Sequence, residues 1–177
     1  MILVTVSRRS TSRIRSFTKD LVSIIPLSMR ISRGHRSLVE LALEAKKNKL
    51  KYVLIVSEWR GNPGSLILHE LTEDSAQRAQ LSRVATIVLK GVKLSRENPL
   101  SSRAYGVSNV AVDYSGCITQ DCFYLADLLN KIFEKILSKD PDIVYKLEDN
   151  KYLELRAVNS HGRVVGPVIK ITRVIPG

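Results

Sequence analysis

Apolar residues at helical spacing mark three segments of the chain. The first stripe follows the N-cap hydroxyls of Ser10-Thr11-Ser12 and stops at Pro26. The second follows Ser37, which can form a capping box with Glu40, and the third stops at Asp140-Pro141. The residues expected to face inward are Ile14, Phe17, Leu21, Ile24 and Ile25, then Leu38, Leu41, Ala42 and Ala45, then Leu125, Leu128, Leu129, Ile132, Phe133 and Ile136.

Short apolar or alternating runs predict strands between these helices. The uninterrupted run 52–56 is typical of a central strand that is covered on both faces. Pro63 and two glycines predict a sharp turn after this strand, with Gly61 or Gly64 at positive φ. Residues 72–83 are polar and are expected to form a loop or a short helix. The other expected strands or extended segments are 1–5, 27–32, 65–71, 85–89, 110–114, 143–147, 152–158 and 164–171.

This order of elements predicts an α/β fold, or an α+β fold with a mixed sheet in each of two halves. A length of 177 residues corresponds to one compact domain or to two small halves that share a core. Residues 93–103, which contain Asn98-Pro99 and several serines, are the best candidate for the link between the halves.

The positive charge is concentrated near the N-terminus. Residues 1–36 contain eight Lys or Arg and one acid, Asp20, so they carry seven of the eleven net positive charges. Seven of those eight cations are arginine, which binds phosphate bidentately and stacks on bases. This bias favours a nucleic-acid partner over a merely solvated basic face.

Residue patterns for catalysis or metal binding are missing from the chain. His35, His69 and His161 lack ligand spacing and are expected at the surface or in turns. No nucleophile elbow or glycine-rich phosphate loop is present, and we expect neither a metal nor a cofactor. Cys117 and Cys122 are expected to be a reduced, buried pair. With no signal peptide and no apolar run of about 20 residues, we expect a soluble, cytoplasmic protein without membrane contact.

Basic residues surround the starts of the first two predicted helices. Free N–H groups and the macrodipole attract anions to helix N-termini, so two such ends could form a phosphate clamp, with Arg33 and Arg36 on the second. The alternative is that these arginines pair with Glu40, Glu44 or Glu58 inside the fold. The aromatic residues Phe17, Tyr52 and Trp59 are expected in the core, so recognition of backbone and shape is predicted rather than stacking on bases.

One set of motifs resembles the N-terminal half of the Brix domain over roughly residues 8–66. They are Thr11-Ser12-Arg13, Phe17-Thr18-Lys19-Asp20-Leu21, Ile25-Pro26, Arg30, Arg33-Gly34, Ser37-Leu38-x-Glu40-Leu41 and Glu58-Trp59-Arg60-Gly61-Asn62-Pro63-Gly64. Gly166-Pro167 and the alternating residues after it are more weakly similar to the closing strand of that domain, where eukaryotic members usually carry Gly-Pro-Arg. By its length the chain is similar to a stand-alone archaeal version of the domain.

The resemblance implies a ribosome biogenesis factor without catalysis, which binds ribosomal RNA or its precursor during processing and subunit assembly. Ribosomal proteins or other assembly factors are further expected partners. It also implies a single domain over residues 1–177 with two similar halves, about 1–92 and 104–177, each related to the anticodon-binding domain of class IIa aminoacyl-tRNA synthetases. The residues expected to bind RNA are Arg8, Arg9, Arg13, Arg15, Lys19, Arg30, Arg33, Arg36 and Arg60.

Two other functions remain open. One is a metal-dependent nuclease or phosphotransferase that uses Asp20 and Glu58 beside the arginines. The other is a protein-interaction scaffold whose basic face docks acidic partners. Cleavage of ribosomal RNA that EDTA and Glu58→Gln abolish would favour the enzyme, whereas a steep fall of affinity with salt favours an RNA complex with several phosphate contacts over the scaffold.

Overall fold

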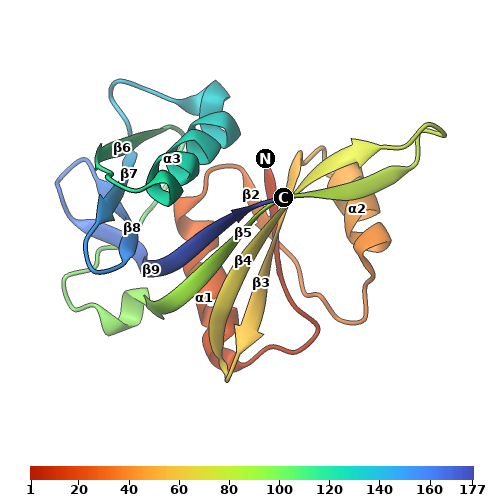
Figure 1. Ribbon diagram of the computed structural model, residues 1–177, viewed down its shortest axis with the longest axis horizontal. Coiled ribbons are helices and arrows are strands. Elements are labelled where there is room, and N and C mark those ends of the chain that lie inside the picture. Colours follow the sequence, from red (N-terminus) through yellow and green to blue (C-terminus); the bar gives the residue numbers. More distant parts are fainter.

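The computed structural model describes residues 1–177, which form an α+β fold with one nine-stranded mixed sheet (Figure 1). The strand order is β2-β1-β3-β4-β5-β9-β8-β7-β6. The pairs β1–β2, β1–β3 and β6–β7 are parallel, and all others are antiparallel. The strands are β1 (Ile2–Val6), β2 (Ser28–Arg30), β3 (Tyr52–Trp59), β4 (Asn62–Glu73), β5 (Ala79–Lys93), β6 (Val110–Gly116), β7 (Ile143–Asp149), β8 (Leu153–Asn159) and β9 (Val164–Pro176).

The first two helices begin where their predicted caps lie, and the third also has a threonine cap. Thr11 caps α1 (Ser12–Ile24), and Ser37 and Glu40 form the expected capping box of α2 (Leu38–Lys47). Thr119 caps α3 (Gln120–Phe133), which ends earlier than Asp140-Pro141 because the chain tightens into a 3-10 turn, η2 (Glu134–Ile136). A second 3-10 turn is η1 (Ser95–Glu97).

The helices cover the two faces of the sheet unequally. Helices α1 and α3 share one face and a core of 32 buried residues, which includes Phe17 of α1 and Phe133 of α3. Helix α2 packs on the opposite face over a smaller core of 6 buried residues, to which Leu41 and Ala45 contribute. Leu38 was expected to face inward but is 46% exposed, because it lies in the first turn of α2 beyond the edge of that core.

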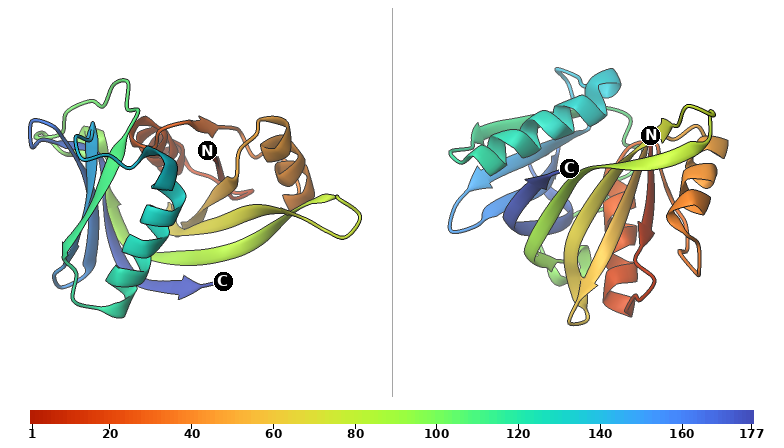
Figure 2. Two further views of the ribbon diagram at one scale, coloured as in Figure 1. Left: turned by 90° about the horizontal axis from the view of Figure 1, so that it is seen from above. Right: turned by 45° about the vertical axis from the view of Figure 1, so that its right-hand side comes forward.

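The prediction of a separate sheet in each half is wrong. Strand β5 of the first half pairs with β9 of the second half, from Ala85↔Pro176 to Lys93↔Val168. The strands of both halves therefore belong to one sheet. The sheet curls, and its β6–β8 end stands across its β3–β5 end (Figure 2). Tyr145 of β7 donates a hydrogen bond to the carbonyl of Ile24 at the end of α1, which ties the two ends together within one core. The two similar halves, 1–92 and 104–177, and their likeness to anticodon-binding domains stay predictions.

The polar segment 72–83 forms neither a loop nor a helix. It is the outer arm of the β4–β5 hairpin, in which Thr72 pairs with Gln80 and only the turn around Asp74 is irregular. The arm extends past the main core, so polar residues suit it, and α2 supports it through the ion pair Lys46–Glu73. Strands in such an arm carry little hydrophobic pattern, which explains why the sequence did not reveal them.

Two further expectations about single residues are wrong. Cys117 and Cys122 form a disulfide with a Cα–Cα distance of 5.4 Å, because the start of α3 folds back onto the end of β6. His69 is 7% exposed on the central strand β4 rather than at the surface. Burial, then the nearby charges of Arg83 and Arg33, lower the pKa of His69, so this imidazole stays neutral.

Candidate nucleic-acid interface

The carboxyl ends of β1 and β2 lie side by side at one edge of the sheet. Their parallel pairing, with Val4 opposite Arg30, brings the segment after β1 beside the segment after β2. Crevices outside the carboxyl ends of parallel strands are common ligand sites in α/β folds. Because α1 leaves β1 at this edge and α2 follows β2, the residues that precede both helices meet there.

A pocket of about 110 Å³ lies at this edge, and four of the nine arginines and lysines expected to bind RNA line it. These four are Arg8, Arg15, Arg30 and Arg33. No acidic residue lines the pocket; its other side chains are small, polar or aliphatic, among them Ser7, Ser10, Thr18 and Ser32. The pocket is therefore a concentration of positive charge without an internal counter-ion.

Arg33 is the buried member of this group. Its side chain is 8% exposed, yet it forms no ion pair, and its one hydrogen bond runs from Nε to the carbonyl of Arg36 at 2.7 Å. Burial, and then the positive charge of Arg8, lower the pKa of Arg33. The Nη groups of Arg33 make no hydrogen bond within the protein, and they are not among its buried unpartnered atoms, so they are open to an anion in the pocket.

The N-terminus of α1 suits an anion, whereas that of α2 is already occupied. The first turn of α1 contains no acid, and Arg15 lies there next to the pocket. In α2 the Glu40 carboxylate accepts the backbone N–H of Ser37 at 2.7 Å. The capping box thus engages the N–H groups of Ser37 and Glu40, and Arg36 donates to the carbonyl of Ser32 at 2.6 Å, while the clamp of Arg33, Arg36 and the α2 amides stays a prediction.

The other predicted residues are placed around this pocket in different ways. Arg13 is paired with Glu97 and also donates to the carbonyl of Val92 at 3.0 Å, so it fastens α1 to the segment that follows β5. None of the nine predicted cations forms an ion pair with the alternative acidic partners, Glu40, Glu44 and Glu58. Exposed side chains without an ion pair are those of Arg9, Lys19, Arg36 and Arg60.

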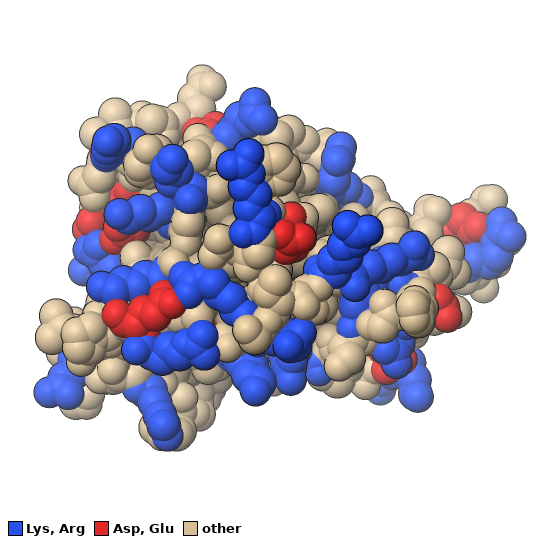
Figure 3. All heavy atoms as spheres, turned by 90° about the horizontal axis from the view of Figure 1, so that it is seen from below, with Lys and Arg blue, Asp and Glu red and all other residues tan.

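The surface around this edge is strongly basic. Seen from the end of the molecule where α1 begins and β3 turns into β4, lysine and arginine side chains gather over much of the face, and acids form only small groups (Figure 3). Such a surface attracts polyanions by long-range electrostatics and then by local phosphate contacts.

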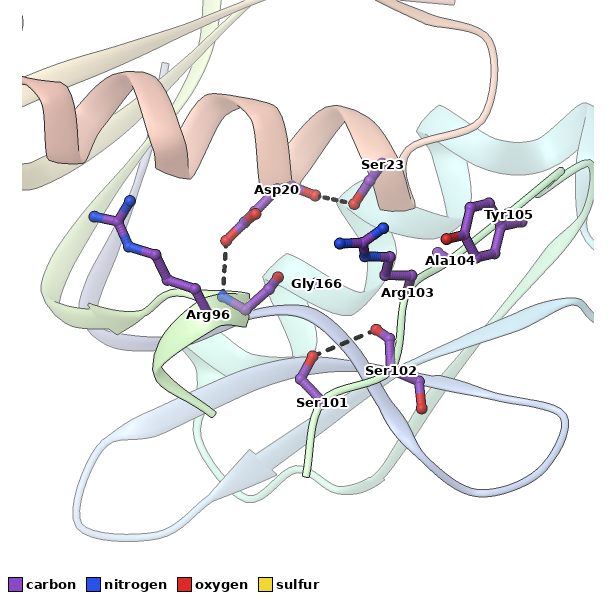
Figure 4. Close-up of a pocket in the computed structure, with 10 residues that line it drawn as sticks. Asp20, Ser23, Arg96, Ser101, Ser102, Arg103, Ala104, Tyr105 and Gly166 are labelled. Atoms are coloured by element: carbon purple, nitrogen blue, oxygen red, sulfur yellow. Dashed lines mark hydrogen bonds between the residues drawn. The ribbon is translucent and has the colours of Figure 1, made fainter. Parts of the chain in front are cut away.

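A larger hollow of about 450 Å³ lies between α1 and the segment that joins β5 to β6. Figure 4 shows Arg103 pointing toward the end of α1 near Ser23, with Tyr105 beside it. Arg96 donates to Ser16 Oγ at 3.2 Å, and neither arginine forms an ion pair. Arg96 and Arg103 were not predicted, because their segment reads only as a polar link.

The two acids considered for a nuclease are engaged elsewhere. Asp20 Oδ2 accepts the backbone N–H of Ser95 at 2.8 Å, and Glu58 Oε1 accepts the backbone N–H of Gly61. The one group of acidic, histidine or cysteine side chains close enough to hold a metal is Cys117, Cys122 and Asp149, and its cysteines form the disulfide. Asp20 and Glu58 thus hold backbone amides rather than a shared metal site.

Trp59 is placed differently from the prediction. It was expected in the core with Phe17 and Tyr52, which are buried, but its side chain is 67% exposed at the β3–β4 turn. Its position could have been inferred from the hairpin itself, because a two-residue turn at Arg60-Gly61 makes Trp59 the last strand residue.

Comparison with known proteins identifies relatives of this chain. A probable Brix domain-containing ribosomal biogenesis protein of Aeropyrum pernix is 43% identical over 94 residues, which cover 53% of this chain and 50% of the relative. A protein of the same description from Sulfurisphaera tokodaii is 24% identical over 175 residues, covering 96% and 90% of the two chains. No family model matches the chain.

Solved structures agree with these relatives. The crystal structure of a probable ribosomal biogenesis protein from Aeropyrum pernix K1 superimposes with a TM-score of 0.80 at 29% identity, covering 97% of this chain and 95% of the other. The chain is thus similar, in sequence and in fold, to Brix domain-containing ribosomal biogenesis proteins of archaea. Mil, an archaeal Imp4-like protein, has a similar fold, with a TM-score of 0.71 at 20% identity over the full length of both chains.

The strongest sequence matches are partial. The chain's matching segment spans about half the length of the Aeropyrum pernix relative and 41% of the one from Pyrococcus horikoshii. No helix of this chain has the length and apolar character that crossing a membrane requires.

Proposed function

We propose that the chain acts in ribosome biogenesis by binding ribosomal RNA or its precursor through phosphate held in the arginine pocket. The pocket is the group Arg8, Arg15, Arg30 and Arg33 at the carboxyl ends of β1 and β2. The proposed role has no catalytic step and takes place in the cytoplasm, beside ribosomal proteins or other assembly factors. The similarity to proteins described as ribosomal biogenesis proteins supports this role.

The observation that carries the proposal is the state of Arg33. A cation that is 8% exposed and lacks an acidic partner costs free energy in the folded protein. A phosphate oxygen offers the acceptors that the Nη donors of Arg33 lack, and its charge offsets that of the neighbouring arginines. RNA supplies such phosphates at regular spacing, so further contacts by the exposed Arg9, Lys19 and Arg60 add to the affinity.

The test compares two replacements of Arg33. Arg33→Gln removes the charge and should weaken binding of labelled ribosomal RNA by about 5- to 150-fold, the equivalent of roughly 1 to 3 kcal/mol. Arg33→Lys keeps the charge but loses the bidentate geometry, so its affinity should lie between those of Arg33→Gln and the wild type. Binding is measured by fluorescence anisotropy at fixed salt.

Arg163→Gln is the matched control, because Arg163 is an exposed arginine in the turn between β8 and β9 and forms no ion pair. It should bind RNA nearly as the wild type does. Thermal melting of each variant shows whether it is folded, and Arg33→Gln should melt no earlier than the wild type, because the buried charge has no internal partner. Wild-type affinity in a folded Arg33→Gln protein would contradict the pocket.

A further inference from the structure

The β3–β4 hairpin presents the single tryptophan of the chain to solvent. Trp59 is 67% exposed and belongs to neither hydrophobic core. An indole at a strand end contributes little to folding when most of its surface stays in water. Its presence there is therefore not explained by packing.

The hairpin that carries Trp59 is rigidly built. Arg60 and Gly61 form a two-residue turn at φ 49° and 82°, the left-handed values that such a turn requires. Glu58 Oε1 accepts the N–H of Gly61, and Thr11 Oγ1 donates to the carbonyl of Gly61 at 2.8 Å. These contacts hold the backbone of the turn, so the strand end that carries the indole is fixed in position instead of lying on a loose loop.

Close packing between the two strands also fixes the strand end that carries Trp59. A Cβ added to Gly64 would lie 2.5 Å from the Cβ of Trp59, so the strand opposite must lack a side chain there. The register shift between Ser57 and Glu58 re-aims the strand end just before the indole. The last turn of this hairpin is thus shaped around the placement of residue 59.

The exposed indole lies close to the arginine pocket. Thr11, which holds the hairpin turn, also caps α1, and its neighbour Ser10 lines the pocket. The hairpin turn and the start of α1 lie at the same end of the molecule (Figure 1). The guanidinium of Arg60 lies 5.5 Å from the centroid of the indole, so a cation accompanies the aromatic surface.

We propose that Trp59 stacks on an unpaired base of the RNA whose phosphates occupy the arginine pocket. The inference rests on the proposed function and narrows its substrate to RNA with unpaired nucleotides, since bases inside a duplex are already stacked on their neighbours. Proteins that bind single-stranded RNA use aromatic side chains and the guanidinium plane of arginine in this way. Trp59 supplies the stacking surface, and Arg60 adds a cation beside the base and its phosphate.

Tryptophan fluorescence tests this contact directly, because Trp59 is the only source of that emission. Titration with a mixed-sequence single-stranded RNA should quench the emission as the base covers the indole. The same sequence in a fully paired duplex should quench it much less at equal occupancy. Occupancy is measured independently by the anisotropy of a label on the RNA.

Affinity supplies the second readout. Trp59→Ala should weaken binding of the single-stranded RNA by about 5- to 150-fold, equivalent to loss of one stacked base. Trp59→Phe should restore most of the affinity, because it keeps a stacking face. The salt slope should not change in Trp59→Ala, since no phosphate contact is lost. Phe123→Ala, which removes another exposed aromatic residue on α3, is the matched control and should bind normally.

The outcomes separate the two proposals. Quenching together with the loss in Trp59→Ala supports stacking. Normal anisotropy with unchanged fluorescence and unchanged affinity of Trp59→Ala overturns stacking and leaves the arginine pocket standing. Absence of any RNA binding in the anisotropy measurement overturns the proposed function, and the stacking inference with it.

Discussion

At the scale of residues, arginines that look equivalent in the sequence differ in their partners. Only Ile14 separates Arg13 from Arg15 in α1, but Arg13 is paired with Glu97 while Arg15 lines the basic pocket. The sequence could predict that arginine gathers near the N-terminus. It could not predict which arginine is neutralised, because the partner of Arg13 lies 84 residues further along the chain.

We expect Arg13 to contribute to stability rather than to RNA binding. Arg13→Gln breaks a partly exposed ion pair and should lower the free energy of unfolding by about 1 kcal/mol at neutral pH. Urea denaturation measures this loss, and Arg9→Gln is the control, since exposed Arg9 has no ion pair. RNA affinity should stay close to that of the wild type; a loss as large as that of Arg33→Gln would contradict this assignment.

The same ion pair should respond to acid. The hydrogen bond from Arg13, and after it the one from the backbone N–H of Leu94, lower the pKa of Glu97 from 4.5 to about 2. A carboxyl whose pKa is lowered in the folded state stabilises the protein above its unfolded pKa, and this contribution is lost as the pH falls toward the folded pKa. The stability difference between wild type and Arg13→Gln should therefore shrink between pH 4.5 and about 2. A difference that stays constant over this range would mean that Glu97 is not the group that Arg13 holds.

At the scale of elements, features encoded by neighbouring residues were predictable. The caps of α1 and α2 and the positive φ of Gly61 are confirmed, because each depends on a few adjacent residues. The pairing of β5 with β9 and the outer arm of the β4–β5 hairpin were missed. These depend on partners far away in the chain or on support from α2, and local patterns do not report either.

A glycine is required at position 64, but for close packing rather than for a positive φ. Gly64 is not at positive φ; its hydrogen instead allows the close approach of Trp59. Gly64→Ala should lower the free energy of unfolding by roughly 1 to 3 kcal/mol, as expected for overpacking. Gly91→Ala is a matched control in β5, where an added Cβ meets nothing within 4 Å. Equal stability of the two variants in thermal or urea denaturation would refute the packing argument.

At the scale of the whole molecule, the sheet decides which charges act together. The parallel pairing of β1 and β2 brings Arg8, Arg30 and Arg33 to one pocket, although 25 residues separate Arg8 from Arg33. All of these arginines were predicted from the sequence to bind RNA, but Arg33 was placed in a clamp with Arg36 and the α2 amides. The pocket adds Arg8, Arg15 and Arg30 to Arg33, whereas Glu40 engages the N–H of Ser37 at the start of α2.

The most direct test of the account is the salt dependence of RNA binding. Each phosphate contact on single-stranded RNA adds about 0.7 to the slope of log affinity against log salt concentration. Replacing Arg8, Arg15 and Arg33 together with glutamine should therefore flatten the slope by about 2, whereas Arg13→Gln should leave it unchanged. A triple variant that is folded and keeps the wild-type slope would contradict the claim that these arginines bind the phosphates of RNA.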